Sequence, residues 1–138
     1  PLPAAPTVKA STLHASDAGG NFTIIVGGTA GIGKELVYAM AIRGADVILA
    51  CRNVGKGESV RQELLFRAAQ TPGTRVNLKI RVAQVDTCDL ESVNKFAKGV
   101  NSTLAKANKK IRFLFLNAGI ARPSSSEKPF TEDGLEKL

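Results

Sequence analysis

The sequence FTIIVGGTAGIGKE, residues 22–35, decides the fold of this chain. Residues 22–26 are apolar except for Thr23, which is typical of a buried parallel strand. Three glycines, Gly27, Gly31 and Gly33, follow where this strand ends and a helix is expected to begin. Glycine permits a tight turn and a close approach of the backbone to a diphosphate, and a helix N-terminus offers unpaired N–H groups. The stretch therefore predicts a dinucleotide-binding turn, with an ordinary Gly-rich turn as the alternative.

From residue 21 onward, short apolar strands alternate with amphipathic helices. We expect strands at 22–26, 47–50, 76–85 and 111–116, helices at about 31–43, 57–70 and 90–106, and the start of a further helix at Thr131-Glu132-Asp133. Strands separated by helices pair in parallel through right-handed crossovers. The expected fold is the first half of a Rossmann-type doubly wound α/β sheet, with strand order 3-2-1-4. Ligands bind such a sheet outside the carboxyl ends of its strands, where the strand order reverses.

Each expected helix carries one apolar stripe at three- and four-residue steps. The expected inward residues are Ile32, Leu36, Ala39 and Met40 in the first helix, Val60, Leu64, Leu65 and Ala68 in the second, and Leu90, Val93, Ala97, Val100 and Leu104 in the third. Gly44 is typical of a helix end, and Asp89 is typical of a helix start. The third strand alternates apolar with polar residues, which indicates a position at the outer edge of the sheet.

The charge of the chain is basic but dispersed. Nineteen Lys and Arg against twelve Asp and Glu give a formal charge of +7 and an isoelectric point near 9.7. The densest cations, between Lys106 and Arg112, are expected at a helix end, where they suit the negative pole of the helix dipole. With one Tyr, no Trp and no interleaving of aromatic and basic residues, we expect no nucleic-acid partner. No apolar run reaches the roughly 20 residues that span a bilayer, so we expect no transmembrane segment.

The N-terminal residues differ in composition from the rest. Residues 1–20 are rich in Pro, Ala, Ser, Thr and Gly and lack periodicity, so we expect an extended arm, followed by a partial Rossmann domain over residues 21–138. Cys51 and Cys88 have no metal-ligand spacing and indicate free thiols in a reducing, intracellular compartment. The sequence leaves open whether this is the cytoplasm or an organelle.

The ends of the four expected strands carry four short motifs. These are VGGTAGIG at residues 26–33, ACRN at 50–53, VDTCDL at 85–90 and LNAG at 116–119. In this order and spacing they resemble the T-G-x-x-x-G-x-G, second-strand, adenine-side and N-N-A-G motifs of the short-chain dehydrogenase/reductase family. The resemblance covers the chain from about residue 22, and it is nearest to the retinol-dehydrogenase-like branch. It implies the N-terminal half of an oxidoreductase that binds a nicotinamide dinucleotide.

The resemblance also implies which residues bind the cofactor. Those at the glycine turn are Gly27, Thr29, Ala30, Gly31, Ile32 and Gly33, and those at the later strand ends are Arg52, Asn53, Asp86, Thr87, Asn117, Ala118 and Gly119. Arg52 offers a fork of donors suited to a 2′-phosphate, and Cys51 occupies the place of an acid that would favour NAD(H), so NADP(H) is expected over NAD(H). Two alternatives are that Arg52 is a surface cation and that Asp86 caps the following turn.

The sequence departs from the family pattern in two ways. Val26 and Leu116 replace a Thr and an Asn, which removes two polar ties near the glycine turn and is expected to affect affinity rather than fold. The family's catalytic Tyr, with a Lys four residues later, has no counterpart, because the one tyrosine is Tyr38 and the residue four further on is Ile42. Tyr38 lies among apolar residues of the first expected helix, where we expect it to pack. We therefore expect no catalytic residue within this chain.

The apolar residues of the expected fourth strand indicate that further protein covers this strand. Residues 111–116, IRFLFL, place apolar side chains on both faces of an edge strand, and long apolar edges aggregate unless they are covered. We expect either the C-terminal half of a parent protein or a protein partner at this edge. Three functions stay open: the cofactor-binding part of an enzyme acting on an alcohol or carbonyl, a catalytically silent dehydrogenase-derived subunit of a larger assembly, and a dinucleotide sensor.

Overall fold

The computed structural model describes residues 22–73, 77–119 and 130–134. Its elements are β1 (Phe22–Val26), α2 (Gly31–Ile42), β2 (Asp46–Cys51), α3 (Val54–Gln70), β3 (Lys79–Gln84), α4 (Leu90–Ala107) and β4 (Ile111–Leu116). The four strands pair in parallel in the order β3-β2-β1-β4, which confirms the expected Rossmann-type topology. The expected arm at 1–20 and the expected start of the third strand at Val76 lie outside the described residues.

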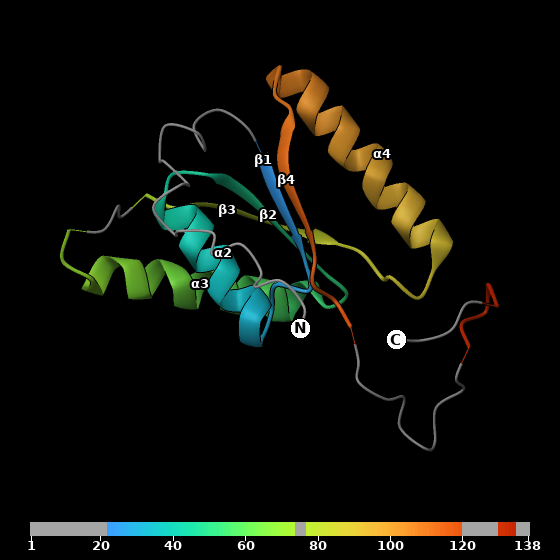
Figure 1. Ribbon diagram of the computed structural model, residues 1–138, viewed down its shortest axis with the longest axis horizontal. Coiled ribbons are helices and arrows are strands. Elements are labelled where there is room, and N and C mark those ends of the chain that lie inside the picture. The colour runs from blue at the N-terminus through green and yellow to red at the C-terminus, as the bar shows by residue number, and fades with distance from the viewer. Residues whose placement is uncertain (1–21, 74–76, 120–129, 135–138) are drawn as a thin grey trace, which may run out of the picture.

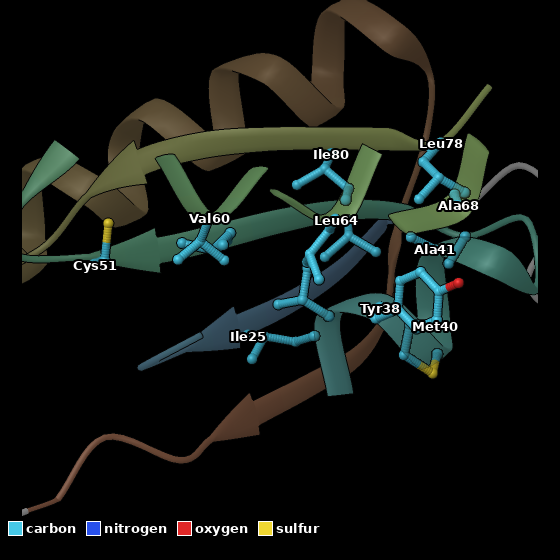
Figure 2. Close-up of a cluster of buried hydrophobic side chains, with 14 residues drawn as sticks. Ile25, Tyr38, Met40, Ala41, Cys51, Val60, Leu64, Ala68, Leu78 and Ile80 are labelled. Atoms are coloured by element: carbon cyan, nitrogen blue, oxygen red, sulfur yellow. The ribbon is translucent and has the colours of Figure 1, made fainter. Parts of the chain in front are cut away.

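Two hydrophobic cores lie on opposite faces of the sheet. Figure 1 shows α2 and α3 along one face and α4 along the other. Because side chains alternate along a strand, Ile25 of β1 belongs to the α2–α3 core, whereas Phe22 and Ile24 belong to the α4 core. Figure 2 shows the α2–α3 core, in which Val60 and Leu64 of α3 lie against the strands. The sheet is therefore buried on both faces near β1 and β2.

The inward face of α2 agrees only in part with the expected one: Met40 is buried and Leu36 packs against the same core, as expected. Its buried residues are Gly33, Val37, Tyr38, Met40 and Ala41. Ile32 was expected to face the core, but it is 80% exposed. The physical reason is the contact of Gly33 with the turn after β1, which rotates the helix by one residue from the expected stripe. The expectation that Tyr38 packs in the core is confirmed, since it is 8% exposed.

The other two helices follow the expected pattern more closely. In α3, Val60, Leu64 and Ala68 are buried, and the helix begins at Val54, three residues before the expected start. Asn53 accounts for this earlier start, because its side chain accepts a hydrogen bond from the Lys56 N–H at 2.9 Å.

The apolar face of α4 is one residue away from the expected one at its centre. Asp89 caps the helix as expected, and Val100 is its buried residue. Phe96 packs against the α4 core together with Val93 and Leu104, whereas Ala97, expected to face inward, is exposed. Leu90 was also expected inward and is 45% exposed, because it lies in the first turn, before the helix reaches the core.

The segment after the fourth strand is a turn where a helix start was expected. The Gly134 N–H donates to the Thr131 carbonyl at 3.0 Å, and Gly134 has a φ of +77°. A left-handed residue at this position interrupts helical backbone, so Thr131-Glu132-Asp133 does not begin a helix. Among the described helices, none is long and apolar enough to cross a bilayer.

A buried carboxylate joins three elements at the amino ends of the strands. Asp46, the first residue of β2, is 4% exposed. It pairs with Lys109, in the turn before β4, and its Oδ1 lies 3.6 Å from the Nζ of Lys79 in β3. The Lys109 Nζ also lies 5.3 Å from the centre of the Phe22 ring. This contact, absent from the sequence-based expectations, ties β2, β3 and the start of β4 together.

We predict that Lys109→Met lowers the free energy of unfolding by about 3 kcal/mol, because it leaves the buried Asp46 carboxylate without its nearer cation while keeping an apolar stem. Urea denaturation measures this change. Lys106→Met is the matched control, since Lys106 is an exposed lysine in the last turn of α4. Equal stabilities of the two variants would contradict the role of the Asp46 pair.

Candidate dinucleotide-binding site

The glycine turn packs directly against the start of α2 and the end of β4. A Cβ on Gly33 would lie 2.1 Å from the Gly27 carbonyl oxygen, and a Cβ on Gly27 would lie 2.7 Å from the Ala118 Cα. The Asn117 Nδ2 donates to the Gly27 carbonyl at 3.1 Å, and the Asn117 N–H donates to the Val26 carbonyl at 3.0 Å. We call these four residues, Gly27, Gly33, Asn117 and Ala118, the glycine junction. Only glycine fits at its first two positions.

Gly31 has a different role from the glycines of the junction. Its φ is +49°, and a Cβ there would meet nothing within 4 Å. The residue thus provides a left-handed bend at the first position of α2, and the space in front of its backbone is open. Open space before a helix N-terminus allows a ligand to approach the backbone N–H groups.

The N-terminus of α2 is suited to an anion. Its cap residue, Ala30, has no side-chain acceptor, and its first turn has no acidic residue. In contrast, Asn53 caps α3 and Asp89 caps α4 through side-chain oxygens. The first N–H groups of α2 therefore need an acceptor from outside the helix, and the helix dipole favours a negative one. A diphosphate meets both requirements, so the residues present fit a dinucleotide.

The expected residues around this N-terminus lie at the surface. Ala30, Gly31 and Ile32 are exposed, and Thr29 is half-buried. The prediction that Ile32 faces the core was wrong, and its side chain is instead exposed in the first turn of α2.

At the end of β2, neighbouring side chains point to different environments. Cys51 is buried, and its Sγ donates to the Asn53 carbonyl at 3.2 Å. Burial raises the pKa of the Cys51 thiol, the Gly57 N–H lowers it and the Glu58 charge raises it further. Arg52 is exposed, and no ion pair joins it to a carboxylate within the described ranges. The cation, not the thiol, is therefore available to a ligand.

At the end of β3, Asp86 is half-buried and Thr87 is exposed. The Oδ1 of Asp86 accepts a hydrogen bond from the Cys88 N–H at 2.9 Å. The turn-capping alternative for Asp86 is therefore present in the structure, and it uses one of the two carboxylate oxygens. The backbone N–H of Asp86 donates to the Ser92 Oγ at 2.9 Å, which holds this loop against α4.

The structure brings the expected residues to one edge of the sheet. All four strands are parallel, so the glycine turn and the segments after β2, β3 and β4 lie at the carboxyl ends of the strands. The structural role of Asn117 was missed in the sequence, because a bond between residues 90 positions apart leaves no local pattern. Ser92 was missed for a similar reason, since a serine in the first turn of a helix is ordinary in sequence.

A cavity between α4 and the sheet lies away from this edge. It has a volume of about 330 Å³ and lies between α4 and the strands β2 and β3, with Ile48, Phe96 and Val100 among its lining residues. Cavity size does not locate a diphosphate site, because the binding groups are backbone N–H groups at an exposed helix end. The glycine junction and the uncapped α2 are therefore the observations that locate the site.

Comparison with known proteins places the chain in a family. The sequence profile described as short chain dehydrogenase matches residues 21–137. Human retinol dehydrogenase 11 is 39% identical over 117 residues, which are 85% of this chain and 32% of that protein. The chain thus belongs to the short-chain dehydrogenase family, whose members bind nicotinamide dinucleotides. It spans about a third of the length of the relatives that it matches.

Solved structures agree with this assignment. A metagenomic short-chain oxidoreductase in complex with NADP matches with a TM-score of 0.63 and 24% identity, over 86% of this chain and 49% of that chain. This likeness concerns the fold. The NADP-bound C-domain of a bacterial malonyl-CoA reductase matches with a TM-score of 0.62 and 26% identity, over 79% of this chain and 16% of that chain.

We predict that Gly33→Ala lowers the free energy of unfolding by about 3 kcal/mol, because the new Cβ overlaps the Gly27 carbonyl and forces backbone apart. Thermal and urea denaturation measure the effect. Gly99→Ala is the matched control: Gly99 lies within α4, its Cβ would meet nothing within 4 Å, and alanine there raises stability by roughly 0.5–1 kcal/mol. A Gly33→Ala variant as stable as the native chain would contradict the junction.

Proposed function

We propose that this chain is the cofactor-binding portion of an oxidoreductase that uses NADP(H) and acts on an alcohol or carbonyl substrate. The observation that carries the proposal is the uncapped, acid-free N-terminus of α2 behind an open glycine turn. Membership of the short-chain dehydrogenase family supports it. The relatives that it resembles include retinol dehydrogenases, which makes an apolar alcohol or aldehyde a reasonable substrate class.

Each expected site residue has a proposed role. Gly27 forms the turn beside the diphosphate, and the backbone N–H groups from Thr29 to Gly33 donate to it. Arg52 and Asn53 lie at the adenosine ribose, and Asp86 and Thr87 lie at the adenine. Asn117, Ala118 and Gly119 lie at the nicotinamide ribose. When bound, NADPH supplies the hydride of the reaction. The residues of this chain bind and orient the dinucleotide, and they move no proton. Residues 21–138 are proposed to form this part of the domain, and 1–20 an extended arm.

The preference for NADP(H) rests on Arg52. Its guanidinium is exposed at the carboxyl end of β2, next to a buried thiol that cannot accept a bond from a ribose hydroxyl. The planar fork of donors suits a 2′-phosphate, and a free 2′-hydroxyl has no acidic acceptor in the Cys51-Arg52-Asn53 segment. NADP as the ligand of two structural neighbours is consistent with this choice.

We predict that Arg52→Ala weakens NADPH binding about tenfold and leaves NADH binding within about twofold, because only NADPH carries the 2′-phosphate. Isothermal titration calorimetry with both nucleotides measures the two affinities. Arg43→Ala is the matched control, because it removes the same charge at the C-terminal end of α2, where the Arg43 guanidinium donates to the Ala39 carbonyl. Equal losses for both nucleotides would refute the role of Arg52, and a native chain that binds neither at millimolar concentration would refute the cofactor site.

A second proposed function is a catalytically silent, dehydrogenase-derived subunit of a larger assembly. The observation in its favour is the environment of Tyr38, which is buried in α2 with the Arg67 guanidinium 4.0 Å from its ring centre. A buried, stacked tyrosine followed four residues later by Ile42 does not provide the family's acid/base pair. A stop codon directly after Leu138 in the coding sequence would favour this function over the first, which expects a Tyr with a Lys four residues later in the residues that follow.

We also propose that a further strand covers β4, supplied by additional residues of the same protein or by a partner chain. Leu114 and Leu116 are 54% and 77% exposed on the α4 face, and Phe113 and Phe115 stack on the other face with ring centres 6.1 Å apart. β4 is the last strand of the sheet in this order, and no further described strand lies along its outer edge. The short span of the chain relative to its relatives supports this proposal.

We predict that the 138-residue chain self-associates through β4 and that the double variant Leu114→Lys and Leu116→Lys is less prone to do so, because charged side chains block edge pairing. Light scattering at increasing concentration checks this. Phe66→Lys is the matched control, since Phe66 is 65% exposed on α3, away from the edge. Association that falls equally in both variants would show that β4 is not the surface responsible.

A further inference from the structure

Two segments far apart in sequence meet at the start of α4. The Leu90 N–H donates to the Asp133 Oδ2 at 3.0 Å, across 43 residues. Figure 1 shows the red segment that contains Asp133 beside the yellow first turn of α4. The segment follows β4, so this bond links the loop after the fourth strand to the helix that follows the third.

Asp133 completes the capping of α4. The Oδ1 of Asp89 accepts from the Glu91 N–H at 2.9 Å and from the Ser92 N–H at 3.2 Å, and the Asp89 N–H donates to the Asp86 carbonyl at 3.3 Å. These bonds satisfy three of the four N–H groups that a helix start leaves without an internal partner. The fourth belongs to Leu90, and Asp133 supplies its acceptor.

The same helical turn holds the loop after β3. The Ser92 Oγ accepts from the Asp86 N–H at 2.9 Å, and the Asp86 Oδ1 accepts from the Cys88 N–H. Leu90, at 45% exposure, and the rest of this first turn lie ahead of the residues that anchor α4 in its core, Val93 and Phe96. With few apolar contacts of its own, the turn depends on its caps for order.

We propose that Asp133 is a positioning residue for the adenosine half of the dinucleotide. Its hydrogen bond to the Leu90 N–H, which we call the clasp, joins residues 130–134 to the turn of α4 that holds the Asp86 loop. The proposal rests on the proposed cofactor site at Asp86. Its physical basis is a chain of hydrogen bonds from Asp133 to Leu90, along one helical turn to Ser92, and from Ser92 to Asp86. By linkage, adenosine binding also strengthens the bond between Asp133 and Leu90.

The clasp acts locally, since Asp133 is exposed and lies outside both hydrophobic cores. Its loss is therefore expected to change cofactor binding much more than global unfolding. The loss is also expected to weaken binding of the adenosine half of the dinucleotide and not of the nicotinamide half. The nicotinamide half lies at Asn117 and Gly119, which are held by β4 and the glycine junction and do not depend on the first turn of α4.

The first test measures binding of two halves of the cofactor by calorimetry. For Asp133→Ala we expect about a fivefold loss of affinity for NADPH and for 2′,5′-ADP, the effect of losing one helix-capping contact, and no change for reduced nicotinamide mononucleotide. Ser92→Ala is expected to reproduce this pattern, because it removes the bond to the Asp86 N–H. Asp133→Asn is expected to retain most of the affinity, because its amide oxygen still accepts from Leu90.

Glu132→Ala is the matched control, since it removes a neighbouring exposed carboxylate of the same charge. Equal losses for Glu132→Ala and Asp133→Ala would show a general charge effect and overturn the clasp. Native-like affinity of Asp133→Ala for 2′,5′-ADP, in a chain that binds NADPH, would overturn the clasp and leave the proposed function intact.

The second test needs no ligand. Amide hydrogen exchange followed by NMR is expected to be at least about fivefold faster at Leu90 and Asp86 in Asp133→Ala and unchanged at core amides such as Ile25 and Leu49. Unchanged exchange at Leu90 and Asp86 would overturn the clasp. If these amides respond but the native chain binds no dinucleotide, the proposed function fails and the positioning role fails with it, while the clasp stands as a structural contact.

Discussion

The approach of Gly33 to the Gly27 carbonyl is the contact on which the rest of the structure depends. It brings the start of α2 against the end of β1 at a separation that no side chain other than hydrogen allows. Asn117 then joins the same carbonyl from the end of β4. This junction sets the rotation of α2, which turns Val37 and Ala41 toward the core and Ile32 toward solvent. The same contact therefore determines both how α2 packs on the sheet and where its N-terminus lies.

The three helices differ in how the N–H groups at their N-termini are satisfied. α3 and α4 begin with side-chain caps that satisfy their first N–H groups, whereas α2 begins with an alanine and has none. An uncapped helix start has a cost in stability, and an anionic ligand removes that cost on binding. The same helix thus carries both the close contact of Gly33 with the Gly27 carbonyl and an N-terminus without a side-chain cap. This arrangement is compatible with a family that binds nicotinamide dinucleotides.

The sheet is well buried at its centre and open at β4. Phe22, Ile25 and Leu49 of β1 and β2 are fully buried, whereas Leu114 and Leu116 of β4 are 54% and 77% exposed. The imbalance follows from the strand order, because β4 has β1 on one side and no further described strand on the other. At the opposite end of the strands, Asp46 of β2 forms ion pairs with Lys79 of β3 and with Lys109, which precedes β4. The relatives that the chain resembles are about three times as long, which is consistent with a sheet that continues past β4.

The sequence by itself determined the four strands, the three helices between them, their parallel order and the edge at which a ligand is expected. These properties follow from local patterns: apolar runs, helical stripes, glycine spacing and a capping aspartate at Asp89. Tertiary structure alone decided the rotation of α2, the inward position of Phe96 rather than Ala97, and the turn at Thr131–Gly134. It also decided the partners of Asp46, Asn117 and Asp133, because each bond joins residues far apart in the chain. A periodic pattern reports that one face is apolar, but the direction of that face depends on contacts that form only when the elements meet.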